Sequence, residues 1–151
     1  MEEYAPPNRR LQNEIARSPL EVDMWFHDNS NTDVYFLIKT GNIRIHMVVN
    51  HTTYPFRPPE FEKVHVNNFA YRDLIITPLM QEHYKGNCPC CESMLCMATQ
   101  RWSPTTTLAE IVFEICDNLS IKRRIVEFIC LNVLVRKYLV PDMNLVLREF
   151  L

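Results

Sequence analysis

The chain has 151 residues, of which 47% are hydrophobic and 23% are charged, and its formal net charge is -2 at pH 7. This length suits a single domain, 1–151, around one core, and the small negative charge gives no reason to expect a nucleic-acid partner. The start Met1-Glu2-Glu3 is acidic and unlike a secretory signal. The most apolar run, 125–135, is short and carries Glu127, so we expect no membrane span and no membrane partner.

The first expected elements are a short helix and three strands. Pro6-Pro7 fits a first helical turn, and Ser18-Pro19 ends the helix. Apolar residues then alternate along three segments, 20–27, 32–38 and 43–49, as in half-buried strands. The connections 28–31 and 40–42 are rich in Asp, Asn, Ser and Gly, and Gly41 can take positive φ. Short turns between neighbouring strands predict an antiparallel meander.

A proline-rich connection follows the third strand. The segment 54–59 reads Tyr-Pro-Phe-Arg-Pro-Pro, and its three prolines remove backbone donors and fix φ. We therefore expect a rigid loop that holds Phe56 either outward, as a contact residue, or against its own sheet. The segment 61–66 predicts a fourth strand, and 67–85 predicts a long loop with one helical turn.

The C-terminal part predicts helices. Thr107 and Glu110 form a capping box, and an apolar stripe at helical spacing follows to Leu119. A further helix is expected from about Ser120 to Tyr138, and a last one over 141–151. Cys116 and Cys130 fall on apolar faces and are expected to be core thiols. Helix, antiparallel strands, loop and helices in this order predict an α+β domain.

The other four of the six cysteines lie in one stretch, 86–110, and these are Cys88, Cys90, Cys91 and Cys96. An adjacent pair such as Cys90-Cys91 cannot usefully staple a fold, and the chain is long enough to bury a core without disulfides. We therefore expect free thiols in a reducing compartment, cytoplasmic or nuclear.

The order of these features resembles the ubiquitin-conjugating enzyme family. The segment 54–59 is similar to the family's Tyr-Pro-Phe-Lys-Pro-Pro motif. The segment 102–104, Trp-Ser-Pro, with Thr107 and an apolar helix after it, is similar to the family's Trp-Ser-Pro-Ala-x-Thr-Ile element. The resemblance covers 7–119, and 120–151 departs from the family's usual C-terminal helices. The cysteine-rich sequence also resembles divergent members of this family that are associated with large DNA viruses. That resemblance would place the protein in a host cell.

The resemblance implies a fold with an N-terminal helix, a four-stranded antiparallel meander and C-terminal helices. It also implies a transferase whose cysteine accepts ubiquitin or a ubiquitin-like modifier as a thioester from an activating enzyme and passes it to a lysine amine. Cys91 best matches the register of the family's nucleophile, with Cys88 and Cys90 as the next candidates. Asn67, in the nearest match to the family's His-Pro-Asn motif, is the expected oxyanion residue, and Asn87 is its rival.

The same resemblance implies two contact surfaces. Phe56, Pro104 and Thr105 are expected to face a ubiquitin ligase, and Arg9 and Arg10 on the first helix are expected to face the activating enzyme. From the residues alone, a solvated helix face is the favoured interpretation of that basic pair.

Three other interpretations remain beside the enzyme. We expect no cofactor and no metal, but Cys88, Cys91, Cys96 and His83 form an alternative zinc set, because Cys88-x-x-Cys91 has the spacing of a zinc knuckle. A noncatalytic ubiquitin-binding module of the same fold is the second alternative. Redox chemistry within 88–91 is the third, although a redox Cys-x-x-Cys normally opens a helix.

Overall fold

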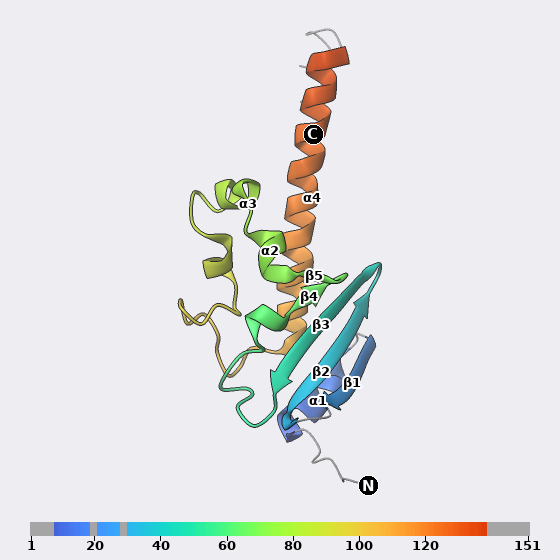
Figure 1. The fold of residues 1–151 in the computed structure, drawn as a ribbon, viewed down its shortest axis with the longest axis vertical. Coiled ribbons are helices and arrows are strands. Elements are labelled where there is room, and N and C mark those ends of the chain that lie inside the picture. The colour runs from blue at the N-terminus through green and yellow to red at the C-terminus, as the bar shows by residue number, and fades with distance from the viewer. Residues whose placement is uncertain (1–7, 19–20, 28–29, 139–151) are drawn as a thin grey trace. The chain divides into compact units, whose positions relative to one another are not determined.

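The computed structural model describes residues 8–18, 21–27 and 30–138 (Figure 1). The chain divides into two compact units, Met1–Ile115 and Cys116–Leu151. The first unit contains a helix, the whole sheet, several short helices and the first turns of the last helix. The α+β class expected from the sequence is therefore confirmed.

The first helix, α1 (Arg9–Arg17), begins after a polar cap. The Asn8 side chain accepts a hydrogen bond from the Leu11 N–H at 2.9 Å and donates another to the Tyr54 carbonyl at 2.8 Å. An asparagine at this position satisfies a backbone donor that the helix leaves unpaired. The helix ends at Ser18, as expected, and the expected opening at Pro6-Pro7 lies outside the described residues.

The sheet has five antiparallel strands in chain order: β1 (Glu21–His27), β2 (Ser30–Thr40), β3 (Ile43–Asn50), β4 (His65–Val66) and β5 (Phe69–Ala70). The three long strands and the meander are confirmed. Gly41 has φ of +56° in the turn between β2 and β3, as expected.

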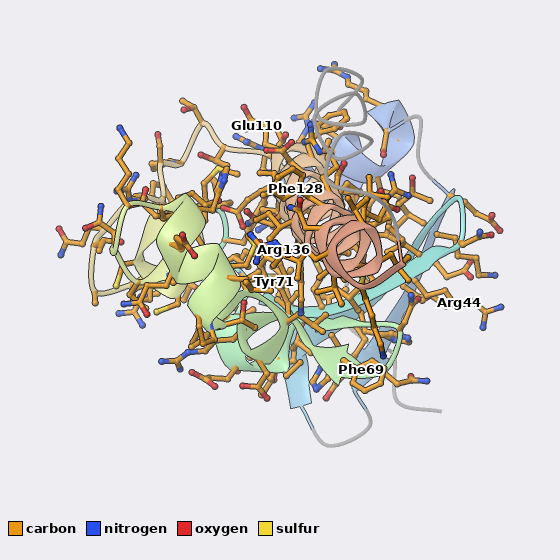
Figure 2. The ribbon with its side chains drawn as sticks, turned by 90° about the horizontal axis from the view of Figure 1, so that it is seen from above. Arg44, Phe69, Tyr71, Glu110, Phe128 and Arg136 are labelled. Carbon is orange, nitrogen blue, oxygen red and sulfur yellow. The ribbon has the colours of Figure 1, made fainter. Side chains whose placement is uncertain are left out.

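The expected strand over 61–66 is wrong in its first half, and the count of four strands is wrong. Residues Phe61–Lys63 form a 3-10 helix, η1, so only two residues of that segment remain in β4. The fifth strand arises because Asn67 and Asn68 take φ of 49° and 71°. Two consecutive positive φ values close a tight hairpin, which pairs β4 with β5. The result is an exposed edge on which Phe69 is 65% exposed (Figure 2).

The core of the first unit joins the sheet to the first turns of α4. Val34, Phe36 and Ile38 alternate along β2 and are buried, as are Ile45 and Met47 on β3. Alternation places these side chains on one face of the sheet. The buried residues of α4 in this unit are Leu108, Ile111, Val112 and Ile115. Each fully buried side chain of this kind contributes about 1.5–3 kcal/mol of hydrophobic stabilisation.

The segment after the sheet contains two short helices, where the sequence predicted a long loop with one helical turn. These are α2 (Tyr71–Ile75) and α3 (Pro78–His83). Pro78 is the first residue of α3, and the Thr77 hydroxyl caps this helix by accepting from the Met80 N–H at 3.3 Å. Tyr71, Ile75 and Met80 are buried.

The last helix, α4 (Leu108–Tyr138), is continuous, where the sequence predicted two helices that divide near Ser120. Its capping box is confirmed: Thr107 N–H donates to a Glu110 carboxylate oxygen at 2.7 Å, and Glu110 N–H donates to the Thr107 hydroxyl at 3.3 Å. The region around Ser120 contains neither proline nor glycine, so nothing there interrupts the helical hydrogen bonds.

The second unit, from Cys116, contains the remaining turns of α4. Cys116 is half-buried rather than fully buried, and Cys130 is exposed, so the core prediction for Cys130 is wrong. The expected helix over 141–151 lies outside the described residues. No helix in the described part of the chain has both the length and the apolarity that crossing a membrane requires.

Candidate active site

Four thiols lie on the segment between α3 and residues 102–104, the Trp-Ser-Pro segment that is called the Trp102 turn below. Cys88 precedes a short 3-10 helix, η2 (Pro89–Glu92), which contains Cys90 and Cys91. Proline fits the first position of this turn, and the Cys91 N–H closes it by donating to the Cys88 carbonyl at 3.0 Å. Cys96 follows a further turn, in which its N–H donates to the Ser93 carbonyl.

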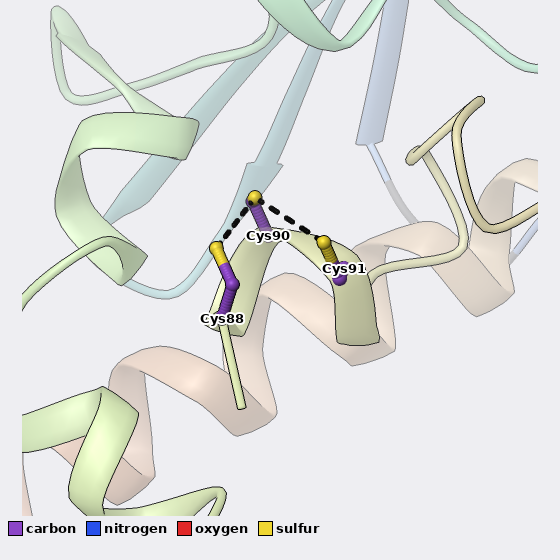
Figure 3. A group of neighbouring side chains, drawn as sticks. All are labelled: Cys88, Cys90 and Cys91. Atoms are coloured by element: carbon purple, nitrogen blue, oxygen red, sulfur yellow. Dashed lines mark hydrogen bonds between the residues drawn. The ribbon is translucent and has the colours of Figure 1, made fainter. Parts of the chain in front are cut away.

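The thiols of Cys88, Cys90 and Cys91 point toward one another (Figure 3). The Sγ atoms of Cys88 and Cys90 are 2.9 Å apart, and those of Cys90 and Cys91 are 3.9 Å apart. All three are free and half-buried. Such a cluster offers nucleophiles, redox partners or metal ligands, and the choice depends on which thiols lose their protons.

Mutual hydrogen bonds give the three thiols different acidities. The hydrogen bond from Cys90 lowers the pKa of Cys88. The same contact, together with burial, raises the pKa of Cys90 to about 12. For Cys91, the hydrogen bond from Cys90 lowers the pKa, but desolvation and the charges of Cys88 and Cys96 outweigh it, and the pKa is raised. Cys88 is therefore the most readily ionised of these three.

Cys96 lies beside this cluster and has its own stabilising partners. Hydrogen bonds from the Thr99 hydroxyl and then from the backbone of Thr99 and Ala98 lower the pKa of Cys96, against an opposing effect of burial. Cys91 also contributes to that lowering, which places the two thiols near each other. The Thr99 hydroxyl also faces the Cys91 carbonyl at 3.1 Å, so its one proton is shared between the two acceptors.

Glu114 on α4 holds the thiol-bearing segment in place. Its carboxylate accepts three hydrogen bonds: from the Tyr71 hydroxyl at 2.9 Å, the Ser93 hydroxyl at 2.8 Å and the Met94 N–H at 2.7 Å. Hydrogen bonds to a charged acceptor are among the stronger ones in proteins. The carboxylate thus joins α2, the residues directly after η2, and α4 at one point.

Glu114 and its partners were not among the site residues expected from the sequence. A signal was present, because Glu114 lies three residues after Ile111 and directly before Ile115, both on the buried stripe. A carboxylate at the border of a buried stripe needs donors, and Ser93 and Tyr71 are both buried polar side chains that supply them.

A cleft of about 390 Å³ opens between the proline loop, residues 54–59, and the cysteine-bearing segment 88–96. Cys90 and Cys96 line it on one side, and Pro58 and Pro59 line it on the other. Two arginines and two glutamates also line it: Arg57, Arg72, Glu60 and Glu62. Arg72 forms an ion pair with Glu62 and interacts electrostatically with Cys90, and both contacts raise the pKa of Arg72.

The two loops expected to meet a ligase lie side by side. The Trp102 indole N–H donates to the Pro55 carbonyl at 2.7 Å, and the Tyr54 and Trp102 rings are 6.0 Å apart. Phe56 is 77% exposed, and Pro104 and Thr105 are exposed as well. Of the two arrangements open for Phe56, the outward one is therefore present.

Arg9 and Arg10 differ in their surroundings. Arg9 is exposed. Arg10 is half-buried, and it pairs with Glu14 at 3.3 Å and donates to the Thr106 carbonyl at 3.2 Å. Glu14 also accepts hydrogen bonds from the Tyr54 hydroxyl and from the Leu108 N–H. Arg10 thus contributes to a polar junction of α1 with the start of α4.

Asn67 lies in the hairpin turn between β4 and β5. Its side-chain oxygen accepts from the Arg44 N–H at 2.9 Å, and its own N–H donates to the Arg44 carbonyl at 2.9 Å. The oxyanion role stays a prediction, because both of these contacts lead to β3 rather than to the cysteines. Asn87 is exposed and directly precedes Cys88.

The expected zinc set is only partly brought together. Within the described residues, the group of potential metal ligands contains Cys88, Cys90 and Cys91, whose ligand atoms all lie within 4.8 Å of one another. Cys90 takes a place that the sequence assigned to Cys96 or His83. His83 is exposed on α3 and lies edge-on to Tyr84 at 5.0 Å between ring centroids.

Comparison with known proteins gives no match: no protein family, no characterised protein and no solved structure is significantly similar to this chain.

Proposed function

We propose that this chain is a conjugating enzyme for ubiquitin or a ubiquitin-like modifier, with Cys91 as the residue that carries the modifier. The proposal combines the resemblance of two sequence motifs to that family with the arrangement of the first unit. The observation that carries it is a half-exposed thiol on a turn that Glu114 anchors. A nucleophile that must meet two large partners in turn needs both exposure and a fixed position.

The proposed reaction has two transfers. In the first, the Cys91 thiolate attacks the carbonyl carbon of the thioester that the modifier forms with the activating enzyme. A new carbon–sulfur bond forms, the old one breaks, and the activating enzyme's cysteine leaves as a thiolate. In the second, a lysine amine attacks the same carbon, a carbon–nitrogen bond forms, Cys91 leaves as a thiolate, and the amine gives up a proton.

The joined loops support a ligase surface at Phe56, Pro104 and Thr105. The Trp102–Pro55 hydrogen bond fixes the two loops relative to each other, so these exposed residues present one rigid patch. An exposed aromatic side chain on a rigid loop is a common anchor in protein interfaces. Arg9 is the exposed member of the basic pair on α1 and faces the activating enzyme in this proposal, and Arg10 supports the helix from its inner side.

A noncatalytic ubiquitin-binding protein of the same fold is the second candidate. Two observations favour it: the pKa of Cys91 is raised, and the Asn67 side chain accepts from the backbone of Arg44. A protein of this kind binds the modifier but forms no thioester with it.

A charging reaction tests both candidates. The reduced protein is incubated with activating enzyme, ATP and ubiquitin, and the products are separated without reductant. We expect a band larger by one ubiquitin that reductant removes and that Cys91→Ala abolishes, whereas Cys130→Ala leaves it unchanged. A band that survives in Cys91→Ala moves the nucleophile to another cysteine. Absence of any band from folded protein that binds ubiquitin selects the noncatalytic candidate.

The pH dependence separates Cys91 from Cys88. A thiol with a raised pKa is mostly protonated at neutral pH, so single-turnover transfer to Cys91 should accelerate as pH rises from 7 to 9. For a thiol with a lowered pKa, the thiolate fraction increases less between pH 7 and pH 9. The rate of transfer to Cys88 should therefore change less over that interval. Activating enzyme charged beforehand, supplied to Cys91→Ala and Cys88→Ala in turn, measures each rate separately.

A further inference from the structure

We propose that Cys88, Cys90 and Cys91 together form a binding site for a soft or borderline divalent metal ion, with zinc as the expected occupant. This three-thiol set differs from the set that the sequence suggested, because it includes Cys90 and leaves out Cys96 and His83. The proposal goes beyond the proposed function and does not rest on it, since metal binding is measurable without any modifier.

The sulfur positions are close to those of metal ligands. A zinc–sulfur bond is about 2.3 Å long, which puts two sulfurs of a tetrahedral site about 3.8 Å apart. The Cys90 and Cys91 sulfurs, at 3.9 Å, already have this separation. The Cys88 and Cys90 sulfurs, at 2.9 Å, need to move apart by about 0.9 Å, which a side-chain rotation at Cys88 allows.

The backbone gathers the three side chains before any ion arrives. Cys88 directly precedes the 3-10 helix and Cys91 lies three residues later, which is one turn of such a helix, and the ligand atoms of the two lie within 4.8 Å of each other. The Cys91 N–H to Cys88 carbonyl bond closes that turn, and Pro89 fixes its φ. Directly after the turn, Glu114 holds Ser93 and Met94. Little conformational entropy therefore remains to be lost when a metal binds.

The charge around the turn fits a metal thiolate. Three thiolates around a divalent ion leave one negative charge in excess. The Arg72 guanidinium is paired with Glu62 and also interacts with Cys90 at the same cleft, so it offsets part of that charge. Thiol-to-thiol hydrogen bonds are weak, so they contribute little to stabilising a cluster of three sulfurs. The three ligands leave a fourth tetrahedral position for a water molecule or a further ligand.

Zinc titration against a chromophoric chelator tests the site in the full, reduced chain. We expect one zinc ion per chain. Cys88→Ser, Cys90→Ser or Cys91→Ser should each weaken zinc binding by about a hundredfold or more, because a thiolate ligand is lost. Cys130→Ser is the matched control, since Cys130 is an exposed thiol on α4, and it should leave the affinity unchanged. Circular dichroism confirms that each variant is folded.

Cys96→Ser and His83→Gln separate this site from the set that the sequence suggested. We expect each to change zinc affinity by less than tenfold. Cobalt(II) supplies a second measurement: the wild type should show a sulfur-to-cobalt charge-transfer band and the visible bands of a tetrahedral ion, and Cys90→Ser should lose intensity in both. No stoichiometric zinc binding by folded wild type overturns the proposal. Unchanged affinity in Cys90→Ser, or a loss in Cys96→Ser equal to that in Cys90→Ser, overturns it as well.

Discussion

At the scale of single residues, Glu114 is the acceptor on which the site depends. Its two oxygens receive three donors from two other parts of the first unit. Ser93 is 1% exposed, so its hydroxyl has little access to water if the carboxylate is lost. Loss of such an acceptor costs more than the net value of the bonds, because buried donors are left without a partner.

We expect Glu114→Gln to lower the free energy of unfolding by about 1–3 kcal/mol. The amide keeps the size of the side chain but replaces one acceptor oxygen with an NH2 group, which faces a donor. Urea unfolding followed by circular dichroism measures the effect. Glu82→Gln, which changes an exposed carboxylate on α3, is the control and should shift stability by less than about 0.5 kcal/mol. Equal effects in the two variants would contradict the role given to Glu114.

The thiols should also differ in their reactivity toward iodoacetamide. Hydrogen bonds from Thr99 and Ala98 lower the pKa of Cys96, whereas burial raises the pKa of Cys116. A lower pKa means a larger thiolate fraction at pH 7, so Cys96 should be alkylated before Cys116 in the reduced, metal-free protein. The difference should narrow as pH rises to 9, where both thiols ionise further.

Mass spectrometry of the peptides after timed exposure measures the two alkylation rates. The same comparison in urea is the control, because unfolding removes the hydrogen bonds and the burial together and should equalise the rates. If Cys116 reacts first in the folded protein, the assignment of the two environments is wrong.

At the scale of elements, the proline loop and the Trp102 turn form one surface with Phe56 exposed on it. We expect Phe56→Ala to reduce ligase-stimulated transfer by about tenfold or more, as loss of an interface anchor does. Charging by the activating enzyme should remain within about twofold of wild type, since Phe56 lies outside the thiol cluster. Parallel charging and ligase assays measure both steps. Equal loss in the two assays rules out the ligase role.

The helices and strands also differ in how well local sequence patterns predicted them. Alternation predicted β1 to β3, and Thr107 and Glu110 predicted the start of α4, because these signals lie within a few residues. Only one helical turn was expected where α2 and α3 lie, since Pro78, which usually interrupts structure, here begins a helix that Thr77 caps. The strand β5 depends on positive φ at two asparagines, a conformation that the sequence permits but does not require.

The candidate site was predictable in composition and not in geometry. The cysteine-rich stretch indicated where four thiols lie together in the chain, whereas the proline-rich segment 54–59 left open whether Phe56 points outward. The grouping of Cys90 with Cys88 and Cys91 could not be derived, because it depends on a 3-10 turn rather than on spacing alone. The anchoring by Glu114 joins residues 20 and 43 positions apart in the chain, which no local pattern shows.

At the scale of the whole molecule, the two proposals make metal binding and charging compete. A Cys91 thiolate bound to zinc is a weaker nucleophile, because the ion withdraws negative charge from the sulfur and occupies space beside it. We expect zinc at saturating concentration to suppress charging of this protein by about tenfold or more, and a chelator to restore it. Single-turnover transfer from activating enzyme that was charged and freed of metal beforehand measures the effect.

Two controls make that experiment decisive. A conjugating enzyme with a single cysteine reports any effect of zinc on the activating enzyme itself. The Cys90→Ser variant should lose most of its sensitivity to zinc while it keeps Cys91 for charging. Undiminished charging of zinc-saturated wild type would show that Cys91 is not both a ligand and the nucleophile.

The three hydrogen bonds of Glu114 should also cause linked substitutions in related sequences. Positions 71, 93 and 114 share one polar junction, so a change at any of them alters what the other two can be. In related chains we expect the three to vary together, with phenylalanine at 71 and alanine at 93 appearing where the acid at 114 has been replaced by an apolar residue. Such linked substitutions would identify related sites even in sequences where other residues replace the cysteines.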